Sequence, residues 1–288
     1  MRAALHAGLV RVVAEQRTGS AGIVLVYHRV GSGTRLDAAV DEASFRSQLR
    51  HLAAAYRVVP ARDIVEAAAT RRARQAYPVA ITFDDDVESH ARVAAPALRA
   101  AGLPATFFLT GRTLDGAAPF WWDDLERSHR EPPSLREAAA RIEALAPADR
   151  AAAAAELRSA APPGGDRGLS RADVRELAHT FEIGFHTRTH DPVATVADDG
   201  LSALVQDGRD VLAQAAGVEI VSFAYPHGRA DQRAAAAVRA AGYLRAYTGA
   251  ATAVRADSDP FLIPRVAAAT TADGLRLQLA RAIGAGRG

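Results

Sequence analysis

Two clusters of polar residues follow directly after apolar runs in this sequence. The segment 82–86, TFDDD, overlaps the end of the apolar run 79–83 and places three carboxylates in a row. The segment 185–191, FHTRTHD, follows another such run and holds His186 and His190. Three adjacent carboxylates repel one another unless a cation or a proton lies among them. Two histidines four positions apart can present both imidazoles on one side, which suits a metal ion.

The two clusters together favour one kind of chemistry. Two histidines and one carboxylate, with open coordination positions, can lower the pKa of a bound water toward neutrality. A neighbouring carboxylate that is not a ligand could then act as general base. Each cluster alone has an ordinary alternative, namely an acidic loop that caps a helix or a pair of structural histidines. Their combination predicts a metal-dependent hydrolase.

Further candidates lie elsewhere in the chain. The turn at 225–228, YPHG, can aim the backbone N–H of His227 into the same region as an oxyanion donor. We also expect Tyr225 in this turn to contact substrate. Trp121 and Trp122 suit a sugar-stacking surface, because an aromatic face matches the C–H face of a pyranose. An aromatic core of their own segment is the equally weighted alternative for either tryptophan.

Short apolar runs alternate with helical patterns along most of the chain. The runs are apolar on both faces, which is typical of strands buried in a parallel sheet, and they occupy residues 23–27, 56–59, 79–83, 105–109, 181–185, 220–225, 243–248 and 261–266. Helical patterns lie between them at 44–55, 61–74, 90–101, 170–179, 199–216, 231–241 and 271–283. This alternation predicts an α/β fold, a distorted (β/α) barrel of about seven parallel strands, with a doubly wound open sheet as the alternative. In a parallel barrel the loops at the carboxyl ends of the strands build the active site, so the motifs should converge there.

The predicted domain organisation is simple. We expect an N-terminal helical extension at residues 1–19 and a single barrel domain at 20–288. A tryptophan-bearing insertion at about 111–169 interrupts the barrel pattern and is a candidate lid or substrate wall.

Composition excludes several function classes. The 288 residues contain no cysteine, which rules out disulfide scaffolds, cysteine nucleophiles and thiolate metal sites. A sequence pI near 9.3 accompanies a net charge of only +2 and a complete lack of lysine, so it gives no evidence for nucleic-acid binding. No apolar run approaches the roughly 20 residues of a transmembrane helix, and no convincing signal peptide is present. We therefore expect a cytoplasmic protein, with export left open and with no indication of its oligomeric state.

Taken together, the motifs resemble those of the polysaccharide deacetylases of the NodB-homology type, carbohydrate esterase family four. That family carries Thr-Phe-Asp-Asp and His-Ser/Thr-x-x-His, which residues 82–85 and 186–190 match without a gap. The resemblance implies that Asp84 is the general base and that Asp85, His186 and His190 bind a divalent metal. Zinc suits such ligands best, with cobalt, nickel and manganese as alternatives.

The chain departs from the family pattern at two places. Ala224 stands where the family has an arginine that orients the base, so Arg188 or Arg265 would have to take that role. The late Leu-x-Leu-x-His motif, source of the general acid, is missing near the C-terminus. His28 ends an early apolar strand instead, as in the permuted exopolysaccharide deacetylases, and is the candidate acid, with His227 as its competitor.

A smaller departure concerns Asp86, which replaces a common glycine. We expect its carboxylate to accept local hydrogen bonds or to pair with His90, and do not assign it to the metal.

The resemblance implies hydrolysis of N-acetyl or O-acetyl groups on an N-acetylated sugar, in a polysaccharide or glycoconjugate. Two alternatives use the same residues. One is a metal-dependent amidohydrolase acting on a non-sugar amide such as a ureide, and the other is a catalytically weak carbohydrate-binding relative.

Overall fold

A computed structural model describes residues 21–31, 39–115, 120–128, 132–162 and 167–285 of the chain. The helical extension expected at 1–19 lies outside these residues. Within them, no helix combines the length and apolarity needed to cross a lipid bilayer.

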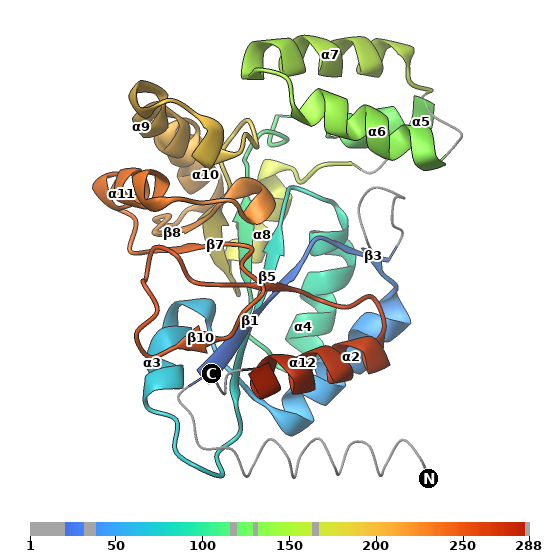
Figure 1. Ribbon diagram of the computed structural model, residues 1–288. Helices are drawn as coiled ribbons and strands as arrows, with labels where there is room; N and C mark the ends of the chain where they lie inside the picture. Colours follow the sequence, from blue (N-terminus) through green and yellow to red (C-terminus); the bar gives the residue numbers. More distant parts are fainter. Residues whose placement is uncertain (1–20, 32–38, 116–119, 129–131, 163–166, 286–288) are drawn as a thin grey trace.

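A curled, mostly parallel sheet forms the centre of the molecule (Figure 1). Along the sheet the strand order is β10-β1-β5-β6-β7-β8-β9, where the bounds are Val254–Arg255 for β10, Ala21–Tyr27 for β1, Pro78–Asp84 for β5, Thr106–Leu109 for β6, Glu182–Phe185 for β7, Ser222–Ala224 for β8 and Arg245–Tyr247 for β9. Only β10 runs antiparallel to its neighbour within this order, and a further strand, β4 (Arg57–Val58), pairs with the start of β5. Seven of the eight apolar runs thus form the strands expected of them, and the predicted barrel-type α/β fold is confirmed.

The eighth run, 261–266, forms little strand. Ile263 makes a single parallel bridge to Tyr247 in β9, and the short strand β11 (Val266–Ala267) pairs with β1. The intervening Pro264 has no N–H to donate to a ladder, which explains why the strand is interrupted. This segment therefore passes from one edge of the curled sheet to the other and links them.

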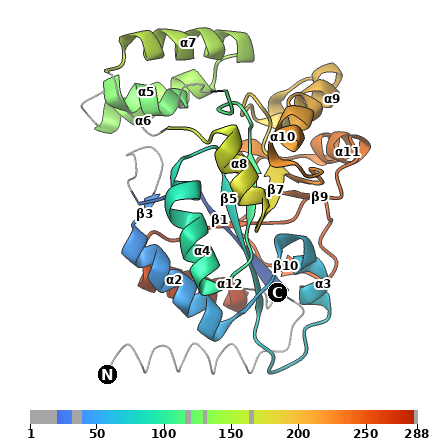
Figure 2. The ribbon, with the colours of Figure 1, turned by 180° about the vertical axis from the view of Figure 1, so that it is seen from behind.

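Helices cover the outside of the sheet (Figures 1 and 2). They are α2 (Glu42–Ala55), α4 (Ala95–Ala101), α8 (Arg171–Ala178), α9 (Asp198–Gln206), α10 (Arg209–Ala216), α11 (Gln232–Ala240) and α12 (Ala272–Ala285). The short helix α3 (Ile64–Ala69) packs instead against Val24 and Ala80 on the inner face of the sheet. A π-helical turn, η2 (His90–Ala94), leads into α4, and two short strands, β2 (Arg29–Val30) and β3 (Ala39–Val40), pair beside the barrel. The capping box of Ser170 and Asp173 at the start of α8 matches the helix start predicted there.

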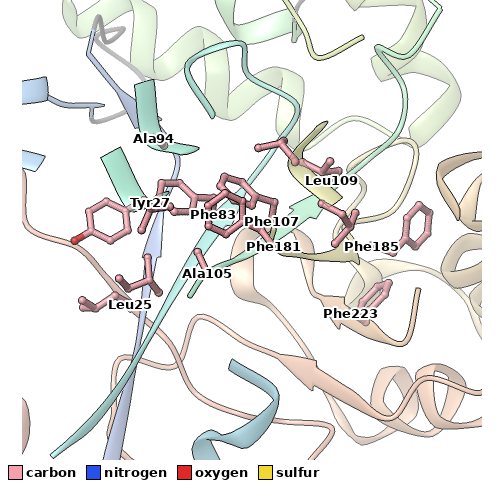
Figure 3. Close-up of a cluster of buried hydrophobic side chains, with 14 of the residues drawn as sticks. Leu25, Tyr27, Phe83, Ala94, Ala105, Phe107, Leu109, Phe181, Phe185 and Phe223 are labelled. Atoms are coloured by element: carbon pink, nitrogen blue, oxygen red, sulfur yellow. The ribbon is translucent and has the colours of Figure 1, made fainter. Parts of the chain in front are cut away.

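Aromatic side chains pack across the central strands near their carboxyl ends. Tyr27, Phe83 and Phe107 occupy paired positions on β1, β5 and β6, and their rings stack across the strands. The centroids of Phe83 and Phe107 lie 4.7 Å apart (Figure 3). All three rings are buried. Apolar burial of this size contributes roughly 2 kcal/mol or more per ring, so the ends of these strands are held firmly where the predicted site begins.

Three helices of the insertion form a separate layer above the strand ends: α5 (Trp121–Ser128), α6 (Pro132–Glu143) and α7 (Pro147–Ala160) (Figure 1). They pack around a small cluster of their own, in which Trp121, Leu125 and Leu135 are buried. The layer lies on the side of the barrel where the parallel strands end.

Candidate active site

The two chemistry-bearing segments meet at the carboxyl end of the sheet. Asp84 is the last residue of β5, Asp85 follows it, and His186 comes directly after β7. Only β6 separates these two parallel strands, so their ends lie close together. Here the protein forms a cavity of about 400 Å³.

Asp85, His186 and His190 bring one potential ligand atom each within 4.8 Å of one another. Nε2 of His190 lies 3.4 Å from Oδ1 of Asp85. The Nδ1 atom of His186 is 2.9 Å from the carbonyl oxygen of Ala224, which can only accept, so Nδ1 carries the proton and Nε2 keeps its lone pair. The three residues therefore converge as a metal site requires.

The protonation of the two histidines also suits a cation. Burial lowers the pKa of His186 to about 4, although the nearby Asp84 carboxylate opposes this shift. Burial likewise lowers the pKa of His190 well below its usual value, and the neighbouring His186 adds to the effect. Both imidazoles are therefore neutral at pH 7, as ligands must be. By donor chemistry the site fits a divalent ion such as zinc.

The backbone at these positions adopts an uncommon conformation. Asp85, Thr187 and His190 have φ angles of 79°, 50° and 57°, in the left-handed region that favours glycine. His227 has a φ of 56° in the turn 226–228. Such conformations cost about 1–3 kcal/mol each and persist where the surrounding structure imposes them, often at functional sites.

Arg265 supplies the guanidinium that Ala224 cannot. Its Nη1 and Nη2 atoms donate to Oδ1 and Oδ2 of Asp84 at 2.6 and 2.7 Å, and both side chains are buried. Arg265 is itself held by the carbonyl oxygen of Thr248 at 3.2 Å. The side chain of Arg188, the other candidate, packs along Gly208.

This ion pair sets the charge of Asp84. Burial by itself would raise the pKa of the carboxyl group, but the attraction of Arg265 and of His186 outweighs it and lowers the pKa to about 2. Asp84 is therefore ionised at pH 7 and can accept a proton. A carboxylate with a lowered pKa is a weak base, so proton transfer to it is easier from a water that a cation has acidified.

Both candidate proton donors reach the cavity. His28 follows β1 and lines the cavity together with Asp84. It contributes to the lowering of the pKa of Asp84. His227 lines the cavity as well, and its ring centroid is 4.7 Å from that of His190.

Two of the three predicted substrate contacts line the cavity, and the third does not. Trp121 and Trp122 both line the cavity, Trp121 from within the small core of the insertion and Trp122 stacked on Phe120 with centroids 4.3 Å apart. The prediction for Tyr225 is wrong. Its ring is fully buried against Phe223, and its hydroxyl donates to the carbonyl oxygen of Phe261 at 3.0 Å. The side chain that follows β8 points into the core and away from the cavity.

Asp86 accepts hydrogen bonds as expected, but the donors lie 24 to 26 positions away and not in its own loop. Its carboxylate accepts from the backbone N–H of Thr110 at 2.8 Å and from the Thr110 hydroxyl at 2.5 Å. The other expectation, a pair with His90, is wrong, because Nε2 of His90 lies 2.6 Å from the carbonyl oxygen of His28. Asp86 thus anchors the start of the insertion.

Sequence patterns did not indicate two features in and beside the cavity. Glu143, at the end of α6, lines the cavity, and no motif surrounds it. Arg150 of α7 forms an ion pair with Asp191, the residue after His190. A polar contact between segments 41 positions apart leaves no local trace in a sequence.

Comparisons with known proteins agree with this geometry. The family described as polysaccharide deacetylase matches residues 71–246. The deacetylase PplD of Streptococcus pyogenes, solved in complex with acetate, is 16% identical with a TM-score of 0.64, over 92% of this chain and 99% of that one. IcaB from Ammonifex degensii is 21% identical with a TM-score of 0.64, over 92% of this chain and 98% of that one.

The deacetylase domain of BpsB from Bordetella bronchiseptica is 14% identical with a TM-score of 0.58, over 87% of this chain and 96% of that one. Identities this low indicate a shared fold alone. No protein with a curated function matches the sequence significantly. The family match, however, spans more than half of the 288 residues and contains Asp84, Asp85 and both histidines of the second motif. The chain therefore belongs to the polysaccharide deacetylase family, whose members act on the acetyl groups of polysaccharides.

Proposed function

We propose that the protein is a metal-dependent hydrolase that removes N-acetyl groups from an N-acetylated sugar, in a polysaccharide or glycoconjugate. One observation carries the proposal. Asp84, held at both oxygens by Arg265, lies in the same cavity as the convergent donors of Asp85, His186 and His190. Family membership does not favour the ureide-type amidohydrolase or the weak binding protein.

In this proposal Asp85, His186 and His190 hold a divalent ion, with zinc as the first candidate. Such an ion lowers the pKa of a water molecule and polarises the acetyl carbonyl group. This chemistry would assist Asp84, because Arg265 lowers the pKa of that carboxyl group and makes it a weak base.

The protein's own residues then carry the proton transfers. Asp84 accepts a proton from the attacking water, while Arg265 fixes the direction of its carboxylate. The water oxygen bonds to the acetyl carbon, and the proposal assigns the backbone N–H of His227 to the oxygen that becomes negative. When the C–N bond breaks, His28 gives a proton to the departing amine, and acetate and a free amino sugar remain.

The walls of the cavity support a sugar substrate. Trp121 and Trp122 add aromatic surface on the side of the insertion, where the C–H face of a pyranose would lie. The PplD structure holds acetate, which is the product that this reaction would release.

The proposal is tested by measuring acetate release from N-acetylglucosamine oligomers of increasing length in the presence of zinc. We expect Asp84→Asn to lower the rate about a hundred- to ten-thousand-fold, the usual value of a general base. Asp257→Asn is the matched control, because Asp257 is exposed, its carboxylate lies beside Arg255, and neither residue lines the cavity. Undiminished activity of Asp84→Asn would overturn the assignment. An O-acetylated sugar in parallel shows whether the enzyme acts on amides or on esters.

A further inference from the structure

The backbone of His28 has an unusual support. β1 ends at Tyr27, whose pairing with Phe83 is the last in the ladder between β1 and β5, and β2 begins at Arg29. His28 lies between the two strands. Its carbonyl oxygen accepts a hydrogen bond at 2.6 Å from Nε2 of His90, a side chain 62 positions away.

A second side chain holds the same segment. The hydroxyl oxygen of Ser89 accepts from the backbone N–H of Val30 at 3.3 Å. Ser89 and His90 are consecutive residues at the start of the π-helical turn η2. Isolated π-helical turns are rare in proteins and occur frequently at functional sites. The two side chains thus form hydrogen bonds with the backbone of the residues on either side of Arg29.

His90 is itself fixed in place. Its side chain is completely buried, and its ring lies 5.3 Å from the ring of Phe83 and 5.3 Å from that of Phe107, measured between centroids. These are the rings that lock β5 to β6. The imidazole therefore has one orientation, and the carbonyl group of His28 is tied to the rigid centre of the barrel.

The direction of the hydrogen bond is settled by its chemistry. A carbonyl oxygen can only accept, so Nε2 of His90 carries a proton. Nδ1 has no hydrogen-bond partner among the described residues. Burial lowers the pKa of His90 to about 3, so the ring is neutral at pH 7 and Nδ1 is unprotonated. A single N–H, aimed at His28, is all that this side chain donates.

We propose that His90 is a positioning residue that holds His28 where its imidazole can protonate the leaving amine. The inference rests on the proposed function, in which His28 is the general acid. It assigns to His90 no contact with substrate or metal. A shift of about 1 Å in a reacting group can cost a hundred-fold in rate, so a side chain that sets the backbone of the acid controls the turnover number.

Four single variants and one double variant test this, and kcat, KM and zinc content are measured for each. His90→Leu keeps an apolar side chain between Phe83 and Phe107 but removes the donor. His90→Gln places an amide N–H at about the reach of Nε2. We expect His90→Leu to lower kcat about ten- to a hundred-fold with KM within about two-fold and zinc content unchanged, and His90→Gln to recover most of the loss. His179→Leu, on an exposed histidine of the same chain, is the matched control and should behave as wild type.

The double variant His28→Ala/His90→Leu decides between positioning and general damage. If His90 acts through His28, the double variant should be no more than about two-fold slower than His28→Ala alone. Losses that multiply in the double variant, an unchanged kcat in His90→Leu, or a glutamine variant as slow as the leucine variant would each overturn the inference.

Imidazole NMR gives a readout that does not need activity. In the wild-type protein the N–H proton of His90 should resonate far downfield and exchange slowly with water, because its hydrogen bond is short and buried. In His90→Leu that signal should vanish and the ring signals of His28 should move. Unmoved His28 signals would overturn the inference. If instead they move while His28→Ala keeps full kcat, His28 is positioned by His90 but is not the acid, and it is the proposed function that must change.

Discussion

The strand-end site and the insertion above it are held together in different ways. At the strand ends, Asp84 is joined to Arg265 across 181 positions by two buried hydrogen bonds in the wall of the cavity. The helices α5 to α7 instead pack on a small cluster of their own. Side-chain ties between them and the barrel include the ion pairs Arg29–Asp123 and Arg150–Asp191.

This difference separates two tasks. Proton transfer and metal binding need positions fixed to a fraction of an ångström, and the buried strand ends provide that. Recognition of a sugar tolerates more adjustment, and the insertion contributes aromatic wall residues from a layer that can change without rebuilding the barrel. Substitutions in the two regions should therefore have effects of different size and on different properties of the enzyme.

The largest effect is expected from a metal ligand. His186→Ala removes one of three donors, so bound zinc should be lost and acetate release should fall about a thousand-fold or more. The metal content after dialysis measures the loss of zinc, and the rate of acetate release with added zinc measures the loss of activity. Chelation of the wild-type enzyme should have the same effect and be reversed by zinc. His179→Ala, at an exposed histidine, should keep both metal and rate.

The next effect falls on stability. Arg265→Met leaves the Asp84 carboxylate buried without its guanidinium, which should lower the free energy of unfolding by about 3–5 kcal/mol. Urea denaturation measures this. Adding Asp84→Asn to Arg265→Met should regain much of the loss, because no charge is then left unpaired. Equal stability of the single and the double variant would contradict this account of the pair.

A smaller effect is expected where the insertion meets the barrel. Asp123→Asn weakens the buried contact with Arg29, made at 2.7 Å, and should cost about 2 kcal/mol. The loss of stability should appear mainly as faster proteolysis within α5 to α7. The rate of acetate release should fall less in this variant than in Arg265→Met. Asp115→Asn removes an exposed ion pair with Arg171 and should leave the cleavage rate unchanged.

The smallest effect concerns the cavity wall. Trp122→Ala removes aromatic surface and should raise KM for an oligomeric substrate about three- to ten-fold, with kcat within about three-fold. Steady-state kinetics on short and long oligomers check this. A fall in kcat with an unchanged KM would place Trp122 with the catalytic residues and weaken the division between the two regions.

The parts that the sequence could predict are those with local signals. Strands buried on both faces appear as short apolar runs, and parallel strands bring their carboxyl ends together, so TFDD at 82–85 and the histidines after 185 could be placed side by side. The family match covers the same stretch, residues 71–246.

The parts that it could not predict depend on long-range pairing. The sequence indicated Arg265 and His28 only beside alternatives, Arg188 and His227. Nothing near Arg265 in the chain shows that it, and not Arg188, pairs with Asp84. Tyr225 was misplaced because a motif gives a residue's position and not the direction of its side chain. The contact between His90 and His28 was missed because a side-chain bond to a backbone carbonyl has no pattern of residue types.

The distance along the chain between Asp84 and Arg265 has a consequence for synthesis. A ribosome makes the carboxylate 181 residues before the guanidinium that neutralises it. During that interval, closing the mouth of the barrel would enclose an unpaired charge at a cost of several kcal/mol. We therefore expect this end of the barrel to close only after the segment that carries Arg265 and links the two sheet edges has left the ribosome.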